Sequence, residues 1–196
     1  MTRRKKSLTG TPQLRKAKRL TGKTIVFRDA NTGDAAFILA LRTDSRKSQH
    51  LSNTSPELGQ QIAWLEAYTD KLDQVYFIIE NRAGKALGTV RLYDSQGTSF
   101  CWGSWILNDD APQCSAIESV LMVYEYAIDY LGFSQAHFDV RKGNESVWRF
   151  HERFGAERIG ETELDYLYRI GSEKIEIARQ RYKKFLPEPL VVVEVE

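Results

Sequence analysis

One histidine, His151, is a side chain that can exchange a proton near neutral pH and has a defined helical setting. Val147, Phe150, His151 and Phe154 recur at i, i+3, i+4 and i+7, which predicts one face of a helix. On such a face a histidine is either a proton donor at the edge of a site or a buried core residue. The residue types alone leave both roles open.

The elements that must position His151 are a strand, a polar turn and a short helix. Residues 136–140 alternate β-formers with polar residues, which predicts a strand. The polar stretch 141–144 then predicts a turn ending at Asn144, whose side-chain oxygen can cap the helix. Gly155 suits the left-handed conformation that ends a helix.

This unit resembles the last conserved block of the GNAT acyltransferases, which move acetyl from acetyl-CoA to an amine. The family's V-x-x-x-N pattern matches residues 140–144, and its Y-x-x-x-G-F/A pattern falls on residues 151–156. The resemblance covers about residues 24–170 and points to the branch with ribosomal-protein and nucleotide-amino-sugar acetyltransferases. It implies an α/β fold with a mixed, mostly antiparallel central sheet, flanked by helices and splayed between the fourth and fifth strands.

The rest of the chain predicts the other elements of such a sheet. Runs of β-formers predict strands at 25–27, 75–79, 86–93, 100–107 and 164–170. Helical periodicity predicts helices through 36–41, from 55 onward with Ser55 as N-cap, from 117 to Gly132, and from 172 to 185. Three consecutive strands with short connections form an antiparallel meander, the order that the family uses.

The resemblance implies acetyl-CoA as co-substrate and no metal. In the family its pyrophosphate binds the N-terminus of the helix after the third meander strand, entered through Q/R-x-x-G-x-G/A. The expected phosphate contacts here are the amides of Cys114, Ser115, Ala116 and Ile117, together with Lys142. The pantetheine arm is expected between Ile106, Leu107 and Asn108 on one strand and residues 139–140 on the other, and Asn144 matches the family's CoA-contacting asparagine.

The helix entry departs from the family pattern, because residues 113–118 contain no glycine. Ser115 and Glu118 instead form an S-x-x-E capping box, which would satisfy the amides that a phosphate needs. Glu118, Asp109 and Asp110 also add negative charge, at a cost on the order of 1 kcal/mol in a wet site. These features favour an alternative: a non-catalytic GNAT-like domain that has lost CoA binding and binds a ligand or protein partner.

The acceptor is expected to be a small-molecule amine, by resemblance a nucleotide-linked or other amino-sugar, with protein acetylation left open. Candidate contacts are Arg42 and Arg46 for an anionic group, which solvent could equally surround, and Trp64 and Tyr93 for stacking. His151 occupies the position of the family's acid tyrosine, which protonates the leaving thiolate.

No general base can be assigned from the sequence. Asp139, Glu80 and Asp94 could act through water, and each could equally be solvated. Positioning a neutral amine can itself supply much of the rate, so a dedicated base is not required.

Charge is distributed unevenly along the 196 residues. Residues 1–23 carry nine of the 28 basic residues and no acidic one, which leaves 19 basic against 26 acidic residues elsewhere. We expect a basic, disordered arm at 1–22, a single domain at 23–186, and a tail or added strand at 187–196. The acidic body argues against nucleic acid as a partner.

Several further properties follow from composition. No window is long and apolar enough to span a bilayer, and no signal peptide is visible, so we expect no membrane partner and a cytoplasmic location. Cys101 and Cys114 lack metal-ligand spacing and need no disulfide, which fits a reducing compartment. The assembly state stays open, with a homodimer among the options.

Overall fold

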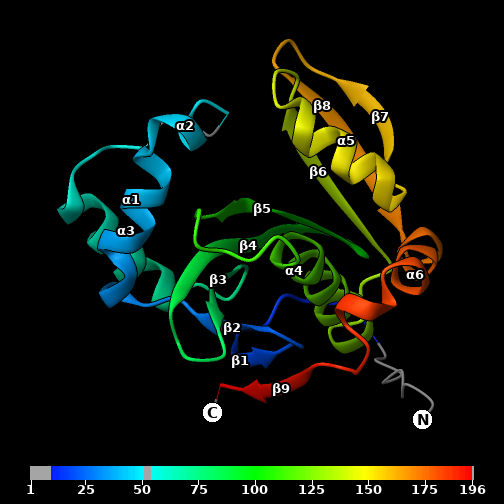
Figure 1. The fold of residues 1–196 in the computed structure, drawn as a ribbon, viewed down its shortest axis with the longest axis horizontal. Coiled ribbons are helices and arrows are strands. Elements are labelled where there is room, and N and C mark those ends of the chain that lie inside the picture. The colour runs from blue at the N-terminus through cyan, green and yellow to red at the C-terminus, as the bar shows by residue number, and fades with distance from the viewer. Residues whose placement is uncertain (1–9, 51–53, 196) are drawn as a thin grey trace.

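The computed structural model describes residues 10–50 and 54–195. In this part of the chain one sheet has the strand order β7-β8-β6-β5-β4-β3-β2-β1-β9 (Figure 1). The strands are β1 Ala17–Thr21, β2 Ile25–Asp29, β3 Val75–Asn81, β4 Ala86–Gln96, β5 Ser99–Leu107, β6 Gln135–Arg141, β7 Glu157–Glu161, β8 Asp165–Gly171 and β9 Val191–Glu194. The helices are α1 Ala35–Thr43, α2 Ser45–Ser48, α3 Leu58–Thr69, α4 Ser115–Tyr124, α5 Glu145–Phe154 and α6 Ser172–Arg181. Short turns of helix lie at Thr32–Asp34, Glu125–Tyr130 and Lys183–Phe185.

Strands β3 to β5 form the predicted antiparallel meander, β2 adds to it antiparallel to β3, and β5 pairs with β6 in parallel. This parallel pairing is short, because only Ser99 to Cys101 meet Gln135 to His137. Beyond these residues β6 stays paired with β8 along its whole length, and it leans away from β5 (Figure 1). The sheet therefore forks between β5 and β6, the fourth and fifth strands of the prediction, and the expected fold class is confirmed.

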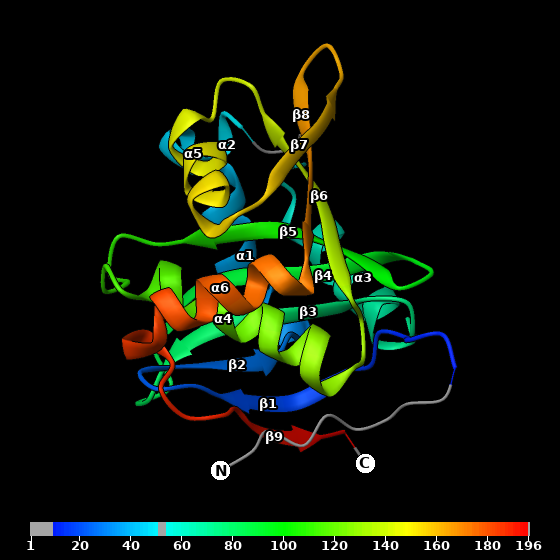
Figure 2. The same ribbon diagram turned by 90° about the vertical axis from the view of Figure 1, so that its right-hand side faces the viewer.

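Helices cover both faces of the sheet (Figure 2). On one face α4 and α6 lie across the strands, and the larger core contains Val120 and Tyr124 of α4 against Phe77 and Phe100 of the sheet. On the other face α1 and α3 build a smaller core around Ile38, Leu65, Tyr68, Tyr76 and Ile78. Each predicted helical stripe thus buries its apolar side on one of two cores.

The two ends of the chain correct the expected domain boundaries. Residues 17–21 form β1, with Ala17 and Leu20 buried, so the basic arm expected at 1–22 is too long. Just before β1, Lys16 Nζ donates to the carbonyl oxygens of Tyr68 and Thr69 at 2.7 and 2.8 Å. Residues 1–9 of the expected arm lie outside the described residues. At the other end β9 pairs with β1, so the added-strand alternative for 187–196 is the observed one.

Two helix starts differ from the prediction. Helix α3 begins at Leu58 with Glu57 at the N-cap, not at Ser55, because the Ser55 hydroxyl accepts from the Glu57 N–H in the turn before the helix. Asn144 does occupy the N-cap position of α5, but its backbone carbonyl, rather than its side chain, accepts from Val147 and Trp148. The predicted stop is confirmed at Gly155, where φ is 99°.

Candidate functional site

Two cavities meet at the fork of the sheet. The fork cavity, of about 280 Å³, lies between the diverging ends of β5 and β6 and is closed by α5. The acceptor-side cavity, of about 410 Å³, lies between α1, α3 and the sheet. Arg42, Tyr93 and Ser104 line both, so the two cavities form a continuous cleft whose junction lies at the centre of the sheet.

A bulge in β5 forms the floor of this junction. The register against β4 slips between Gly103 and Ile106, and Ser104 takes a positive φ of 47° that a side chain rarely adopts. The Thr89 hydroxyl donates to the Ser104 carbonyl at 2.8 Å and stabilises the bulge. A Cβ on Gly103 would lie 3.0 Å from the Tyr93 hydroxyl, so glycine lets the Tyr93 ring lie against the strand.

His151 lines the fork cavity but is only 4% exposed. Its ring packs among Phe138, Trp102 and Phe150 at centroid distances of 4.5, 5.2 and 5.7 Å, and its Nδ1 has no partner among the described residues. Burial lowers its pKa to about 3. The imidazole is therefore neutral at pH 7, which corrects the expectation that it delivers a proton readily near neutral pH.

The capping box expected at the start of α4 does not form. The Ser115 hydroxyl is buried and has no partner in the described chain. The Glu118 carboxylate, only 1% exposed, accepts from the N–H groups of Thr24 and Ile25 at 2.7 and 3.2 Å and from the Thr24 hydroxyl. Glu118 therefore points into the core and away from the helix entry.

The first amides of α4 are consequently left unpaired by the protein. Within the described chain the N–H groups of Cys114, Ala116 and Ile117 donate to no protein acceptor, whereas Ser115 N donates to the Pro112 carbonyl. Unpaired N–H groups at a helix start carry partial positive charge and bind anions. The glycine-free entry thus keeps the chemistry of a phosphate site.

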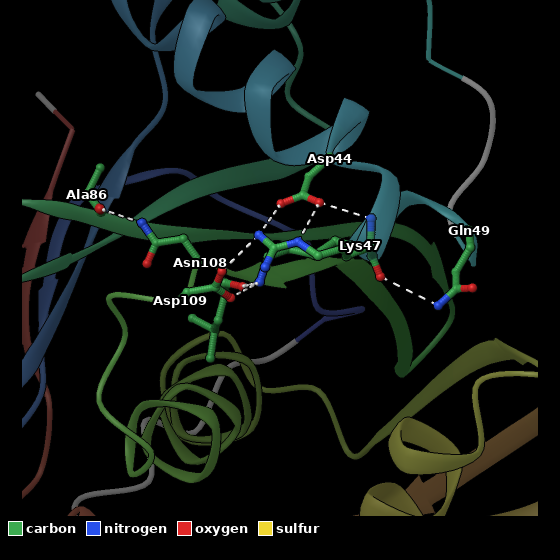
Figure 3. A network of polar contacts seen from close by, with 8 residues as sticks. Asp44, Lys47, Gln49, Ala86, Asn108 and Asp109 are labelled. Atoms are coloured by element: carbon green, nitrogen blue, oxygen red, sulfur yellow. Dashed lines mark hydrogen bonds and ion pairs between the residues drawn. The ribbon is translucent and has the colours of Figure 1, made fainter.

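The acidic residues before α4 are matched by cations from other segments, as Figure 3 shows for Asp109. Asp109 accepts from Lys47 Nζ at 2.7 Å and from Arg46 Nη2 at 2.9 Å, and these bonds lower the pKa of its carboxyl. Asp110 pairs with Lys85 at 2.9 Å. The charge repulsion expected from both aspartates is therefore largely neutralised.

Arg46 does not line either cavity, which corrects its expected role as an acceptor contact. Its side chain is 71% exposed and ion-paired with Asp44 and Asp109. The neighbouring Lys47 also donates to the Leu107 carbonyl at 3.1 Å, a strand-end group that the sequence suggested for the pantetheine arm. Helix α2 is therefore linked to the end of β5 (Figure 3).

Of the remaining residues that were expected to contact acetyl-CoA, only some lie at the fork cavity. Asn144 lines the fork cavity. Ile106 and Asn108 bond toward β4, since Ile106 pairs with Thr89 and Asn108 N donates to the Leu87 carbonyl at 2.8 Å. Lys142 turns toward the β7–β8 hairpin, where it pairs with Glu161 at 3.3 Å and lies over the Tyr166 ring. Lys142 is thus absent from the lining of the fork cavity.

The acceptor-side cavity combines arginines with aromatic rings. The other candidate acceptor contacts, Arg42, Trp64 and Tyr93, line it, and Arg42 Nε donates to the Thr54 hydroxyl at 2.7 Å. Trp64 is 37% exposed and stacks on Tyr68. The wall therefore offers cationic and stacking groups side by side.

Sequence reasoning missed Arg91 of β4, which also lines this cavity. Its guanidinium lies 5.2 Å from the Trp64 ring and 4.8 Å from the Tyr93 ring, and its Nη2 bonds to Gln74. Its Nε is buried with no partner in the described residues. The available signal was its position two residues before Tyr93, which puts both on one face of a strand.

The three carboxylates that the sequence offers as a general base lie in different surroundings. Glu80 is buried and paired with Arg28 at 2.8 Å, and Asp94 lies 3.4 Å from His137. Asp139 lines the fork cavity. In the described part of the chain no group of His, Cys, Asp and Glu side chains could bind a metal ion, and no helix has the length and apolarity to span a membrane.

Comparisons with known proteins agree with this geometry. The family model "Acetyltransferase (GNAT) domain" matches residues 24–157. Apo FdhC, described as a nucleotide-linked sugar GNAT, is 36% identical with a TM-score of 0.78, over 86% of this chain and 98% of that one. No curated protein matches significantly.

Two more distant solved structures share the fold. A GCN5-related N-acetyltransferase from Brucella melitensis is 18% identical with a TM-score of 0.75, over 91% of this chain and 90% of that one. The spermidine N-acetyltransferase of Vibrio cholerae, in complex with CoA and spermine, is 14% identical with a TM-score of 0.71, over 78% and 98%.

Proposed function

This chain belongs to the GNAT acetyltransferase family, and from that membership we propose that it acetylates the amine of a nucleotide-linked amino-sugar with acetyl-CoA as donor. Acyl-CoA-dependent N-acetyl transfer is the activity of the family. The choice of acceptor rests on the acceptor-side cavity, whose wall combines two arginines with aromatic rings. The 36% identity to a nucleotide-linked sugar GNAT supports the same choice.

The fork supports acetyl-CoA as the donor. Beyond Cys101 and His137 the facing edges of β5 and β6 have no strand partner among the described residues, so their backbone groups can pair with an extended amide-containing arm. The unpaired amides of Cys114, Ala116 and Ile117 suit a pyrophosphate. The capping box and the acidic residues at the start of α4 favoured a domain without CoA. Because Asp109 and Asp110 are ion-paired and Glu118 points into the core, these residues do not argue against CoA binding.

The acceptor-side cavity supports an anionic, ring-bearing acceptor. Arg42 and Arg91 offer guanidinium groups that recognise phosphate oxygens. Trp64, which is partly exposed, can stack on a sugar or a nucleobase. A polyamine fits this wall less well, because its positive charges would face the two arginines.

Direct attack accounts for the transfer. The amine lone pair forms a bond to the thioester carbonyl carbon, the carbon–sulfur bond breaks, and the amine loses one proton. The cleft's part is to orient the amine at the junction lined by Tyr93 and Ser104, which converts a bimolecular step into one between positioned groups.

The test is an acetylation assay with the purified protein, acetyl-CoA and a panel of amines, following thiol release and product mass. The panel contains nucleotide-linked amino-sugars, the corresponding free amino-sugars, spermidine and lysine peptides. We expect an acetylated nucleotide-linked amino-sugar as the best product. Turnover of spermidine or of peptides without turnover of any nucleotide-linked amino-sugar would overturn the acceptor assignment.

A further inference from the structure

Asp139 lies where β6 separates from β5. His137 is the last β6 residue paired with β5, opposite Cys101, and Cys101 in turn pairs with Tyr93 of β4. Asp139 follows His137 by two positions, so its side chain leaves the same face of the sheet as these residues. It lines the fork cavity together with Tyr93, beside the junction with the acceptor-side cavity.

The other carboxylates around this face already have side-chain partners. Asp94 lies 3.4 Å from His137, and Asp165 lies 3.2 Å from Arg141. Among the described residues Asp139 shares no salt bridge or side-chain hydrogen bond. It is therefore a carboxylate that lines the cleft and is available to a ligand.

The surroundings of Asp139 make it a better proton acceptor than an ordinary aspartate. Partial burial, and then the nearby carboxylate of Asp165 on β8, raise its pKa, while Arg141 and His137 on its own strand act in the opposite direction. From β4 and β5 it faces Tyr93 and Cys101, whose pKa values are raised mainly by burial, so both remain protonated beside it.

We propose that Asp139 is the catalytic base that accepts the proton of the acceptor amine, a role that rests on the acetyl transfer proposed above. As the new carbon–nitrogen bond forms, the nitrogen becomes positively charged and strongly acidic, and its proton moves to the Asp139 carboxylate, directly or through one water. The carbon–sulfur electron pair leaves with the thiolate, which takes a proton from solvent in the open cleft. Asp139 then returns its proton to water.

The Asp139→Asn variant tests this role, because it keeps the size of the side chain and removes the basic oxygen. We expect kcat to fall about 100-fold or more, within the range for loss of a general base. The apparent affinity for acetyl-CoA, measured by calorimetry, should stay within about twofold. In wild type, activity should fall at acid pH as both the acceptor amine and Asp139 are protonated, and the variant should lose the part of this limb that Asp139 contributes.

Asp94→Asn is the matched control, because Asp94 pairs with His137 near the same face but lines neither cavity. It should keep kcat within about twofold of wild type. If Asp139→Asn has a lower melting temperature than wild type, Asp139→Ser serves as a second variant. Asp139→Glu keeps a carboxylate and should have a higher kcat than Asp139→Asn. A kcat for Asp139→Asn within threefold of wild type would overturn the assignment.

The failure of this proposal can be separated from the failure of the acceptor proposal. If wild type acetylates another amine of the panel, the acceptor assignment fails and the variants are compared with that amine. If no amine reacts, the slow hydrolysis of acetyl-CoA is compared, since water then replaces the amine and must lose its proton to the same base. In either case an unchanged rate for Asp139→Asn contradicts the role of Asp139, and a large loss supports it.

Discussion

His151 and Asp139 both line the fork cavity, yet their surroundings differ. His151 comes from α5 and is enclosed by aromatic rings, and this burial lowers its pKa. Asp139 comes from β6 at the fork of the sheet and remains partly exposed. A proton transfer at this cleft is therefore better assigned to the strand than to the helix.

The neutral state of His151 predicts how stability depends on pH. The folded-state pKa of about 3 lies below the usual 6.5, so protons bind the unfolded chain more tightly. The free energy of unfolding should therefore fall as pH drops below about 6.5, by up to about 1.4 kcal/mol per pH unit from this group. Urea unfolding at pH 7, 6 and 5 should show a smaller decline for His151→Phe than for wild type. Equal slopes would contradict a buried neutral imidazole.

At the scale of elements, one side chain links α4 to the turn between β1 and β2. Glu118 accepts two backbone N–H groups and a hydroxyl from Thr24 and Ile25, and the sequence spacing S-x-x-E does not reveal this. The spacing describes what can form locally, whereas the observed bonds span more than ninety residues and satisfy buried donors at the sheet.

This arrangement predicts that, of the two residues of the expected capping box, only Glu118 contributes substantially to the free energy of unfolding. Glu118→Gln should lower the free energy of unfolding by roughly 1–2 kcal/mol, because charge-assisted bonds to buried donors are weakened. Ser115→Ala should change it by less than about 0.5 kcal/mol, because its hydroxyl has no partner. Urea titrations measure both. A loss of about 1 kcal/mol for Ser115→Ala, as expected for an N-cap, would show that the Ser115 hydroxyl caps α4 and would contradict this arrangement.

Much of the element order could be predicted from the sequence, since the meander, the long helix to Gly132 and the unit around α5 all have clear periodicity. Strand β1 was not predicted because its residues Lys18 and Arg19 suggested a solvated arm, although Ala17 and Leu20 are buried. Strand β7 was not predicted because four of its five residues are exposed. Strand β1, which lies between β2 and β9, and the edge strand β7 are both specified by their neighbours more than by their own pattern.

At the scale of the whole molecule, the site is built by segments far apart in the chain. The acceptor-side cavity takes Arg42 from α1, Trp64 from α3 and Arg91 from β4, and the fork cavity takes Asp139 from β6. The sequence could suggest Arg42, Trp64 and Tyr93 by resemblance. It could not exclude Arg46 or select Arg91 and Asp139, because ion pairing and cavity lining depend on which strands and helices meet.

The most direct test of the account is the ratio of kcat/KM for a nucleotide-linked amino-sugar to that for the same free amino-sugar. We expect a ratio above about 100 in wild type, since phosphate contacts to two arginines and stacking on Trp64 each contribute a kcal/mol or more. Arg91→Met should lower the ratio at least tenfold, while Arg149→Met, a change at an exposed arginine of α5, should leave it unchanged. A wild-type ratio near one would contradict recognition of the nucleotide in the acceptor-side cavity.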